Sequence, residues 1–83
     1  MNFKKEEVYD LIREELGLEP DFEIRESMTL ATDLEMDSLS KISVATEIED
    51  HYSITLDGSV LSEVRTVDDM LKHIEEACKD KVQ

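Results

Sequence analysis

Apolar residues recur at helical spacing in three stretches of the chain, and each stretch predicts an amphipathic helix. The first helix is expected over residues 3–16, where the apolar positions are Val8, Leu11, Ile12 and Leu16. The second is expected from residue 38 to about residue 52, where the positions are Leu39, Ile42, Ala45, Ile48 and Tyr52. The third is expected from residue 67 to about residue 79, where they are Val67, Met70, Leu71, Ile74 and Cys78. The three stripes are predicted to face a shared core.

Short polar residues and a glycine mark where these helices begin and end. Gly17 is expected to end the first helix in a left-handed C-cap, with Leu18 folding back on the last turn. Asp37 has the short acceptor side chain that suits the N-cap of the second helix. Thr66 is expected to cap the third helix, with Asp69 completing a variant of the capping box.

The connections between the helices contain turn-forming residues interspersed with apolar ones. The connection over residues 18–36 is long for a small domain. Its regularly spaced apolar residues predict a structured loop held against the core. One helical turn is expected there near residues 27–30. Residues 53–58 alternate like a strand, but an isolated strand has nothing to pair with. We therefore expect a loop with a turn at Asp57-Gly58, followed by a short helix over residues 59–64.

These elements predict an all-α fold, a small antiparallel bundle of three long helices plus one short helix. The chain has 83 residues, which is enough for one small domain covering residues 1–83. A chain of this size buries only roughly 60–65% of its unfolded surface, so its core has little to spare.

The charge of the chain narrows the classes of partner. It carries 22 acidic residues against 9 Lys and Arg, giving a net charge of −13. This excess disfavours nucleic-acid phosphates and anionic membranes, so neither a nucleic-acid partner nor membrane insertion is expected, and the natural partners are basic. Cys78 is the one cysteine, and residues 1–5 open the chain without an apolar signal core. A cytoplasmic protein is therefore expected.

Ser38 is the candidate functional residue, because it follows the expected N-cap at the junction between a long loop and an apolar-striped helix. A helix start leaves backbone N–H groups without intrahelical acceptors and carries the positive end of the helix dipole. A phosphate esterified to a hydroxyl at this position would be held by those groups. On its own, a serine at a helix start is common and needs no function.

The segment Asp37-Ser38-Leu39, with Leu34 four residues before the serine, resembles the Asp-Ser-Leu motif of acyl carrier proteins. The resemblance continues through Ile48-Glu49-Asp50-His51-Tyr52 and the Thr66-Val67 helix start, and so covers nearly the whole chain. It implies an acyl-carrier-protein-like fold in which Ser38 bears 4′-phosphopantetheine, transferred from coenzyme A. The thiol of that group carries acyl intermediates as thioesters for fatty acid or related biosynthesis.

The resemblance also implies partners. They are a phosphopantetheinyl transferase and acyl-processing enzymes with basic patches, which meet a monomeric carrier that has no catalytic residues of its own. The positions that would contact these enzymes are Asp37, Leu39, Glu47, Glu49 and Asp50.

Two departures from the family pattern keep other functions open. Carriers of fatty acid synthesis commonly have glycine and a small residue before the motif, where this chain has Glu35 and Met36. Many also place acids early on the following helix, where this chain has Ser40, Lys41 and Ser43. A specialised carrier of polyketide, aminoacyl or dedicated lipid groups is one alternative. An acidic helical interaction module without a prosthetic group is the other.

Other chemistries meet fewer of their requirements. His51 and His73 invite a search for a hydrolase triad, but the chain has no Gly-x-Ser-x-Gly nucleophile elbow. One cysteine and two distant histidines lack the spacing of structural zinc sites. The acids of residues 33–37 resemble the start of a calcium loop, but its sixth position is Ser38 instead of glycine and its twelfth is Val44 instead of glutamate. No metal ligands are expected.

Overall fold

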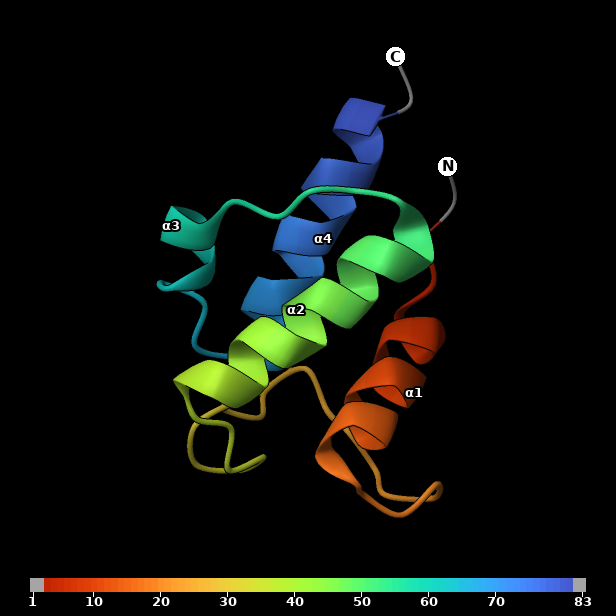
Figure 1. The fold of residues 1–83 in the computed structure, drawn as a ribbon. Helices are drawn as coiled ribbons and strands as arrows, with labels where there is room; N and C mark the ends of the chain where they lie inside the picture. Colours follow the sequence, from red (N-terminus) through yellow and green to blue (C-terminus); the bar gives the residue numbers. More distant parts are fainter. Residues whose placement is uncertain (1–2, 82–83) are drawn as a thin grey trace.

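Four helices make up the regular structure of the computed structural model, which describes residues 3–81 (Figure 1). They are α1 (Lys5–Leu16), α2 (Ser38–Tyr52), α3 (Gly58–Leu61) and α4 (Val67–Lys81). The predicted all-α fold is confirmed. Within the described residues, the one β-type pairing is an isolated antiparallel bridge between Thr29 and Thr66.

The predicted caps set the helix boundaries. Gly17 has φ 69°, and the N–H groups of Gly17 and Leu18 donate to the carbonyls of Glu14 (3.3 Å) and Arg13 (2.8 Å). This pair of bonds is a Schellman motif, in which the left-handed residue ends the helix. At the start of α4, the Asp69 N–H donates to the Thr66 hydroxyl at 3.1 Å, and the Asp69 carboxylate accepts from the Thr66 N–H at 3.3 Å. The capping box is confirmed.

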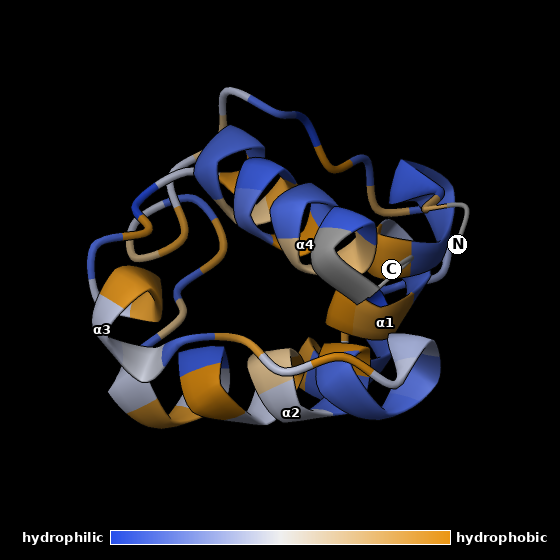
Figure 2. Cartoon of the chain, turned by 90° about the horizontal axis from the view of Figure 1, so that it is seen from above, coloured by the Kyte–Doolittle hydropathy of each residue, from blue (hydrophilic) through white to orange (hydrophobic). Residues whose placement is uncertain are grey.

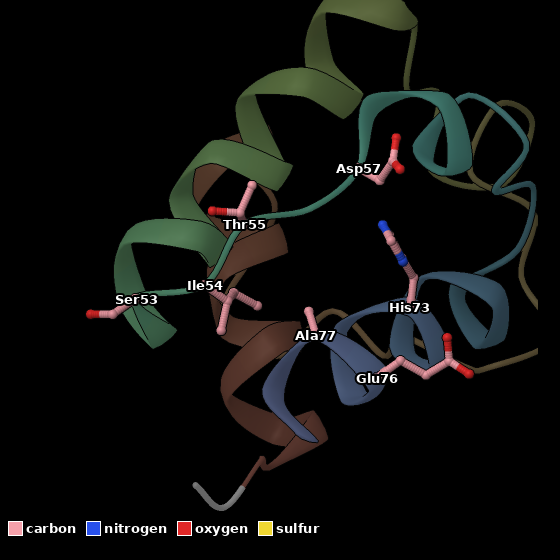
Figure 3. Close-up of a pocket in the computed structure, with 7 residues that line it drawn as sticks. All are labelled: Ser53, Ile54, Thr55, Asp57, His73, Glu76 and Ala77. Atoms are coloured by element: carbon pink, nitrogen blue, oxygen red, sulfur yellow. The ribbon is translucent and has the colours of Figure 1, made fainter. Parts of the chain in front are cut away.

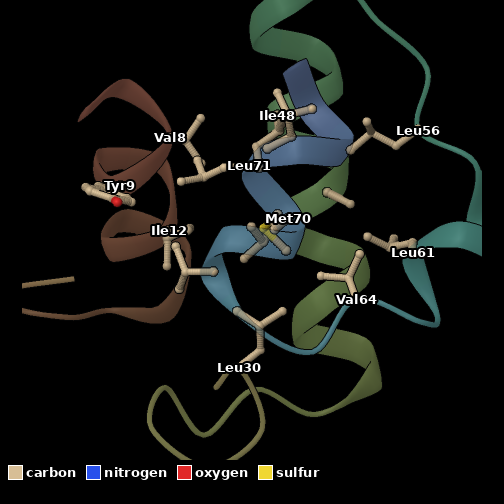
Figure 4. Close-up of a cluster of buried hydrophobic side chains, with 14 of the residues drawn as sticks. Val8, Tyr9, Ile12, Leu30, Ile48, Leu56, Leu61, Val64, Met70 and Leu71 are labelled. Carbon is tan, nitrogen blue, oxygen red and sulfur yellow. The ribbon is translucent and has the colours of Figure 1, made fainter. Parts of the chain in front are cut away.

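One core joins the three long helices to the loop between α1 and α2 (Figure 4). Its fully buried residues include Ile12 of α1, Leu30 of the loop, Ile48 of α2, and Met70 and Ile74 of α4. Such burial removes each side chain from water at a gain of about 1.5–3 kcal/mol. The core therefore depends on the loop as well as on the helices.

The first turns of α2 differ from the predicted stripe. Leu39 and Ile42 are 75% and 56% exposed, whereas Val44, which the stripe omitted, is fully buried. Lys41 is partly buried, and its ammonium donates to the carbonyls of Val64 (2.9 Å) and Leu61 (3.4 Å). Apolar periodicity shows that a helix has an apolar side, but the packing of the neighbouring elements decides how the helix is rotated.

Two shorter predictions are also corrected. The short helix begins at Gly58, capped by the Asp57 side chain on the Ser59 N–H (2.9 Å), and ends at Leu61 instead of spanning 59–64. The helical turn expected near residues 27–30 forms slightly later, where the Asp33 N–H donates to the Thr29 carbonyl at 3.0 Å, because the backbone of residues 28–30 pairs with residues beside Thr66.

The long loop is held to the start of α4 by backbone hydrogen bonds. The Leu30 N–H donates to the Arg65 carbonyl, and the Val67 N–H donates to the Met28 carbonyl, each at 2.9 Å. The predicted attachment of this loop to the core is confirmed, since Ile24, Leu30, Leu34 and Met36 are all buried. Over the described residues, no helix combines the length and the apolar character needed to cross a membrane.

Candidate functional site

The candidate site begins at the N-cap of α2. The Asp37 Oδ1 atom accepts from the Ser40 N–H at 2.8 Å, and the Asp37 carbonyl accepts from the Lys41 N–H at 3.0 Å. The hydrogen bond from the Ser40 backbone holds the pKa of the Asp37 carboxyl below its ordinary value of 3.8. Asp37 therefore remains ionised at neutral pH and fixes the point at which the helix starts.

The residues just before the cap determine that Ser38 faces outward. Met36 is buried, and its N–H donates to the Leu30 carbonyl at 2.9 Å. Glu35 has φ 53°, the left-handed backbone that glycine adopts most readily. The change in backbone direction at Glu35 lets Leu34 and Met36 both enter the core while Ser38 is exposed. Ser38 thus occupies the first position of α2, within reach of another protein.

A groove of about 600 Å³ runs beside Ser38, between the long loop and the segment that follows α3. Its lining residues are Thr29, Leu30, Ala31, Thr32, Met36, Asp37, Ser38, Lys41, Ser62, Val64 and Arg65. It contains two cationic residues, Lys41 and Arg65, in a chain whose net charge is −13. An exposed hydroxyl at a helix start fits a phosphate ester on Ser38.

The acidic residues predicted to meet partners have different surroundings. Glu47 and Asp50 are exposed on α2. Glu49 is half-buried, and its carboxylate accepts from the Leu56 N–H at 2.7 Å, holding the loop after α2 against the helix. Asp37 serves as the cap, and Leu39 is exposed immediately after Ser38.

Both histidines lie outside the Ser38 groove. His73 lines a separate hollow of about 440 Å³ between α4 and residues 53–57, where it faces Asp57 (Figure 3). Its Nε2 atom is buried without a hydrogen-bond partner among the described residues. His51 Nε2 lies 3.6 Å from the Glu7 carboxylate, and its ring packs edge-on against Tyr52. The structure therefore does not bring either histidine together with Ser38.

Comparisons with known proteins show the family to which the chain belongs. The family model of the phosphopantetheine attachment site matches residues 6–74. The meromycolate extension acyl carrier protein of Mycobacterium leprae is 34% identical over 68 residues, covering 82% of this chain and 58% of that protein. The acyl carrier protein of Lactococcus lactis subsp. cremoris is 34% identical over 73 residues, covering 84% of this chain and 90% of that protein.

A solved structure gives the same result for the fold. A candidate acyl carrier protein from Mycobacterium tuberculosis superposes with a TM-score of 0.80 at 26% identity, covering 87% of this chain and 95% of that one. The helix order and the family match define the class of phosphopantetheine-attachment domains. The chain belongs to the acyl carrier protein family. It spans 58% of the length of the Mycobacterium leprae relative.

The sequence predicted the cap by Asp37, which is confirmed, and the candidate residue Ser38, but it did not predict all of the residues around them. Arg65 and Val64 line the groove although they are distant from Ser38 in the chain. No local pattern marks them, because their position follows from the backbone pairing of residues 28–30 with residues 65–67.

The backbone conformation of Glu35 generates the first prediction. Glu35→Gly is expected to raise the free energy of unfolding by about 0.5–1 kcal/mol, because glycine adopts positive φ without the steric cost of a Cβ atom. Glu35→Ala is the matched control, since it removes the carboxylate but keeps the Cβ, and should bring no such gain. Urea unfolding followed by circular dichroism measures both. A loss of stability in Glu35→Gly would contradict the assignment of strain at this position.

The cap of α2 generates a prediction about pH. Asp37→Ala is expected to lower the melting temperature at neutral pH by several degrees, while Asp37→Asn, which can still cap, should retain most of the stability. The pKa of Asp37 is lowered by folding, so its contribution is present above the unfolded value of 3.8 and is lost as pH falls through the folded value. The gap between wild type and Asp37→Ala should therefore narrow as the pH falls below 3.8 in circular dichroism melts. A gap that stays constant would mean that the charged carboxylate is not the capping group.

Proposed function

We propose that Ser38 is the attachment residue for 4′-phosphopantetheine, and that the chain carries acyl groups as thioesters for fatty acid or related lipid biosynthesis. The observation that carries the proposal is an exposed hydroxyl at the first position of α2, beside a groove with two cations, in a chain of the acyl carrier family. The Mycobacterium leprae relative is named for meromycolate extension, and that name supports a fatty-acyl cargo.

The residues around Ser38 have distinct roles in this proposal. Asp37 fixes the start of the helix and so the position of the Ser38 oxygen. Lys41 links α2 to the carbonyls of Leu61 and Val64, keeping one wall of the groove in place. Arg65 is a second cationic residue that lines the same groove. The thiol of the attached group supplies the thioester chemistry.

Loading of Ser38 requires a partner enzyme. The Ser38 oxygen forms a bond to the pantetheine-bearing phosphorus of coenzyme A, adenosine bisphosphate leaves, and the hydroxyl proton passes to a base of the phosphopantetheinyl transferase. The chain itself then acts as a substrate and not as a catalyst, and tethering keeps the acyl group at a high effective concentration near each docked enzyme. We propose one carrier domain over residues 1–83, acting as a cytoplasmic monomer and meeting its partners through Asp37, Leu39, Glu47, Glu49 and Asp50.

Intact mass spectrometry tests the attachment. After incubation with coenzyme A and a broad-specificity phosphopantetheinyl transferase, the wild-type chain is expected to gain one phosphopantetheine group. Ser38→Ala should gain none, because the accepting oxygen is gone. Ser43→Ala, an exposed serine on the same helix, should be loaded as the wild type is. An unmodified wild-type mass, with the chain folded and the transferase active on another carrier, would favour an interaction module without a prosthetic group.

A further inference from the structure

The end of α2 meets the start of α1 at a cluster of polar side chains, at the opposite end of α2 from Ser38 (Figure 1). The Tyr52 hydroxyl donates to the Glu7 Oε1 atom at 2.9 Å and lies 3.2 Å from the Lys4 carbonyl. Lys4 occupies the N-cap position of α1, where its side chain makes no capping hydrogen bond. The first turn of α1 is therefore fastened to α2 by Tyr52 instead of by a side-chain cap of its own.

His51 brings a second donor to the same carboxylate. Its Nε2 atom lies 3.6 Å from Glu7 Oε1, the atom that already accepts from Tyr52. The His51 ring packs edge-on against the Tyr52 ring, with centroids 4.8 Å apart and an interplanar angle of 89°, and this contact orients Nε2. A neutral imidazole carries a proton on one nitrogen, whereas imidazolium carries a proton on both. Protonation of His51 therefore turns this close approach into an ion pair.

The surroundings of His51 favour a positive charge. His51 lies in the last turn of α2, where the negative end of the helix dipole stabilises cations. The ribbon of α2 is mostly hydrophilic in its last turns (Figure 2). The titratable groups near this junction are Glu7 of α1, Lys4 just before it, Glu47 and Asp50 of α2, and Cys78 of α4, which interacts with Tyr52. Acids thus outnumber cations around the imidazole.

The bond from Tyr52 does not change over the pH range in which histidine titrates. Burial of the ring, followed by the hydrogen bond to Glu7, raises the pKa of Tyr52 to about 12. The hydroxyl therefore keeps its proton and can donate to Glu7 throughout the range from about pH 5 to about pH 8. What varies in this range is the proton on the imidazole.

We infer that His51, Glu7 and Tyr52 form a clasp between the end of α2 and the start of α1 that tightens as the pH falls. Tyr52 supplies a constant hydrogen bond, and protonated His51 adds an ion pair to the same carboxylate. The added stability is present on the acidic side of the histidine range and is lost as the pH rises and His51 gives up its proton. The inference does not depend on the attachment at Ser38, which lies at the other end of the helix.

Melting temperatures of the full-length chain, measured by circular dichroism, test the clasp. The quantity compared is the difference between the wild type and His51→Gln, at about pH 5.5 and at about pH 8. This difference should be larger by about 2–5 °C at the lower pH, because an exposed ion pair and a helix end each contribute modestly to a small domain. Loss of the packing between His51 and Tyr52 affects both pH values alike, so the change with pH isolates the proton. Spectra at both pH values check that each variant is folded.

Variants of two neighbouring glutamates separate the ion pair from general electrostatics. Glu7→Gln keeps an oxygen that accepts from Tyr52 but removes the charge, so in this background the change with pH should fall to about half or less, the helix end alone remaining. Glu6→Gln is the matched control, since it removes the same charge from an exposed carboxylate one residue away. In that background the change with pH should match that of the wild type.

Two results would overturn the inference. One is a difference between the wild type and His51→Gln that is the same at both pH values, which would show that the ion pair contributes nothing to stability. The other is an equal change with pH in the Glu7→Gln and Glu6→Gln backgrounds, which would mean that His51 responds only to the net charge of −13.

Discussion

The backbone hydrogen bonds between residues 28–30 and residues 65–67 hold the candidate site in place. The Leu30 N–H donates to the Arg65 carbonyl, and the Leu30 carbonyl accepts from the Met36 N–H, both at 2.9 Å. One residue after Met36, Asp37 caps α2 and presents Ser38 to solvent. The start of α4, which is far from Ser38 in the chain, thus determines where the Ser38 hydroxyl lies. Without these hydrogen bonds the loop would be flexible, and holding Ser38 in one position would then cost more conformational entropy.

This arrangement separates two kinds of surface chemistry. The chain as a whole is strongly acidic, whereas the first turns of α2 present Leu39 and Ile42 to solvent and contain one cation, Lys41. Acidic charge acts over long distances and keeps such a carrier soluble, while apolar contact acts only on touching and discriminates by shape.

Much of the fold could be predicted from local patterns, because caps and periodicity are local. Gly17, Asp37 and the Thr66–Asp69 pair all act where the sequence places them. Ser38 was predicted as the candidate residue from the same local pattern, together with its resemblance to a known motif. The exposure of Ile42 was not predicted, because an apolar stripe does not show how its helix is rotated. Leu39 was assigned both to the stripe and to the partner contacts, and its exposure fits only the second assignment. The groove residues Val64 and Arg65 were also missed, since backbone pairing between distant segments leaves no mark on either one.

If the backbone hydrogen bonds hold Ser38 in place, the long loop unfolds in the same cooperative unit as the helices. Native-state amide hydrogen exchange by NMR tests this most directly. The N–H groups of Leu30, Met36 and Val67 are expected to exchange within about tenfold of the rate of Ile48, in the middle of α2, because all would open only when the domain unfolds. Fast exchange of Leu30 and Met36, with Ile48 still protected, would show that the loop opens by itself. In that case the start of α4 would not hold Ser38 in position.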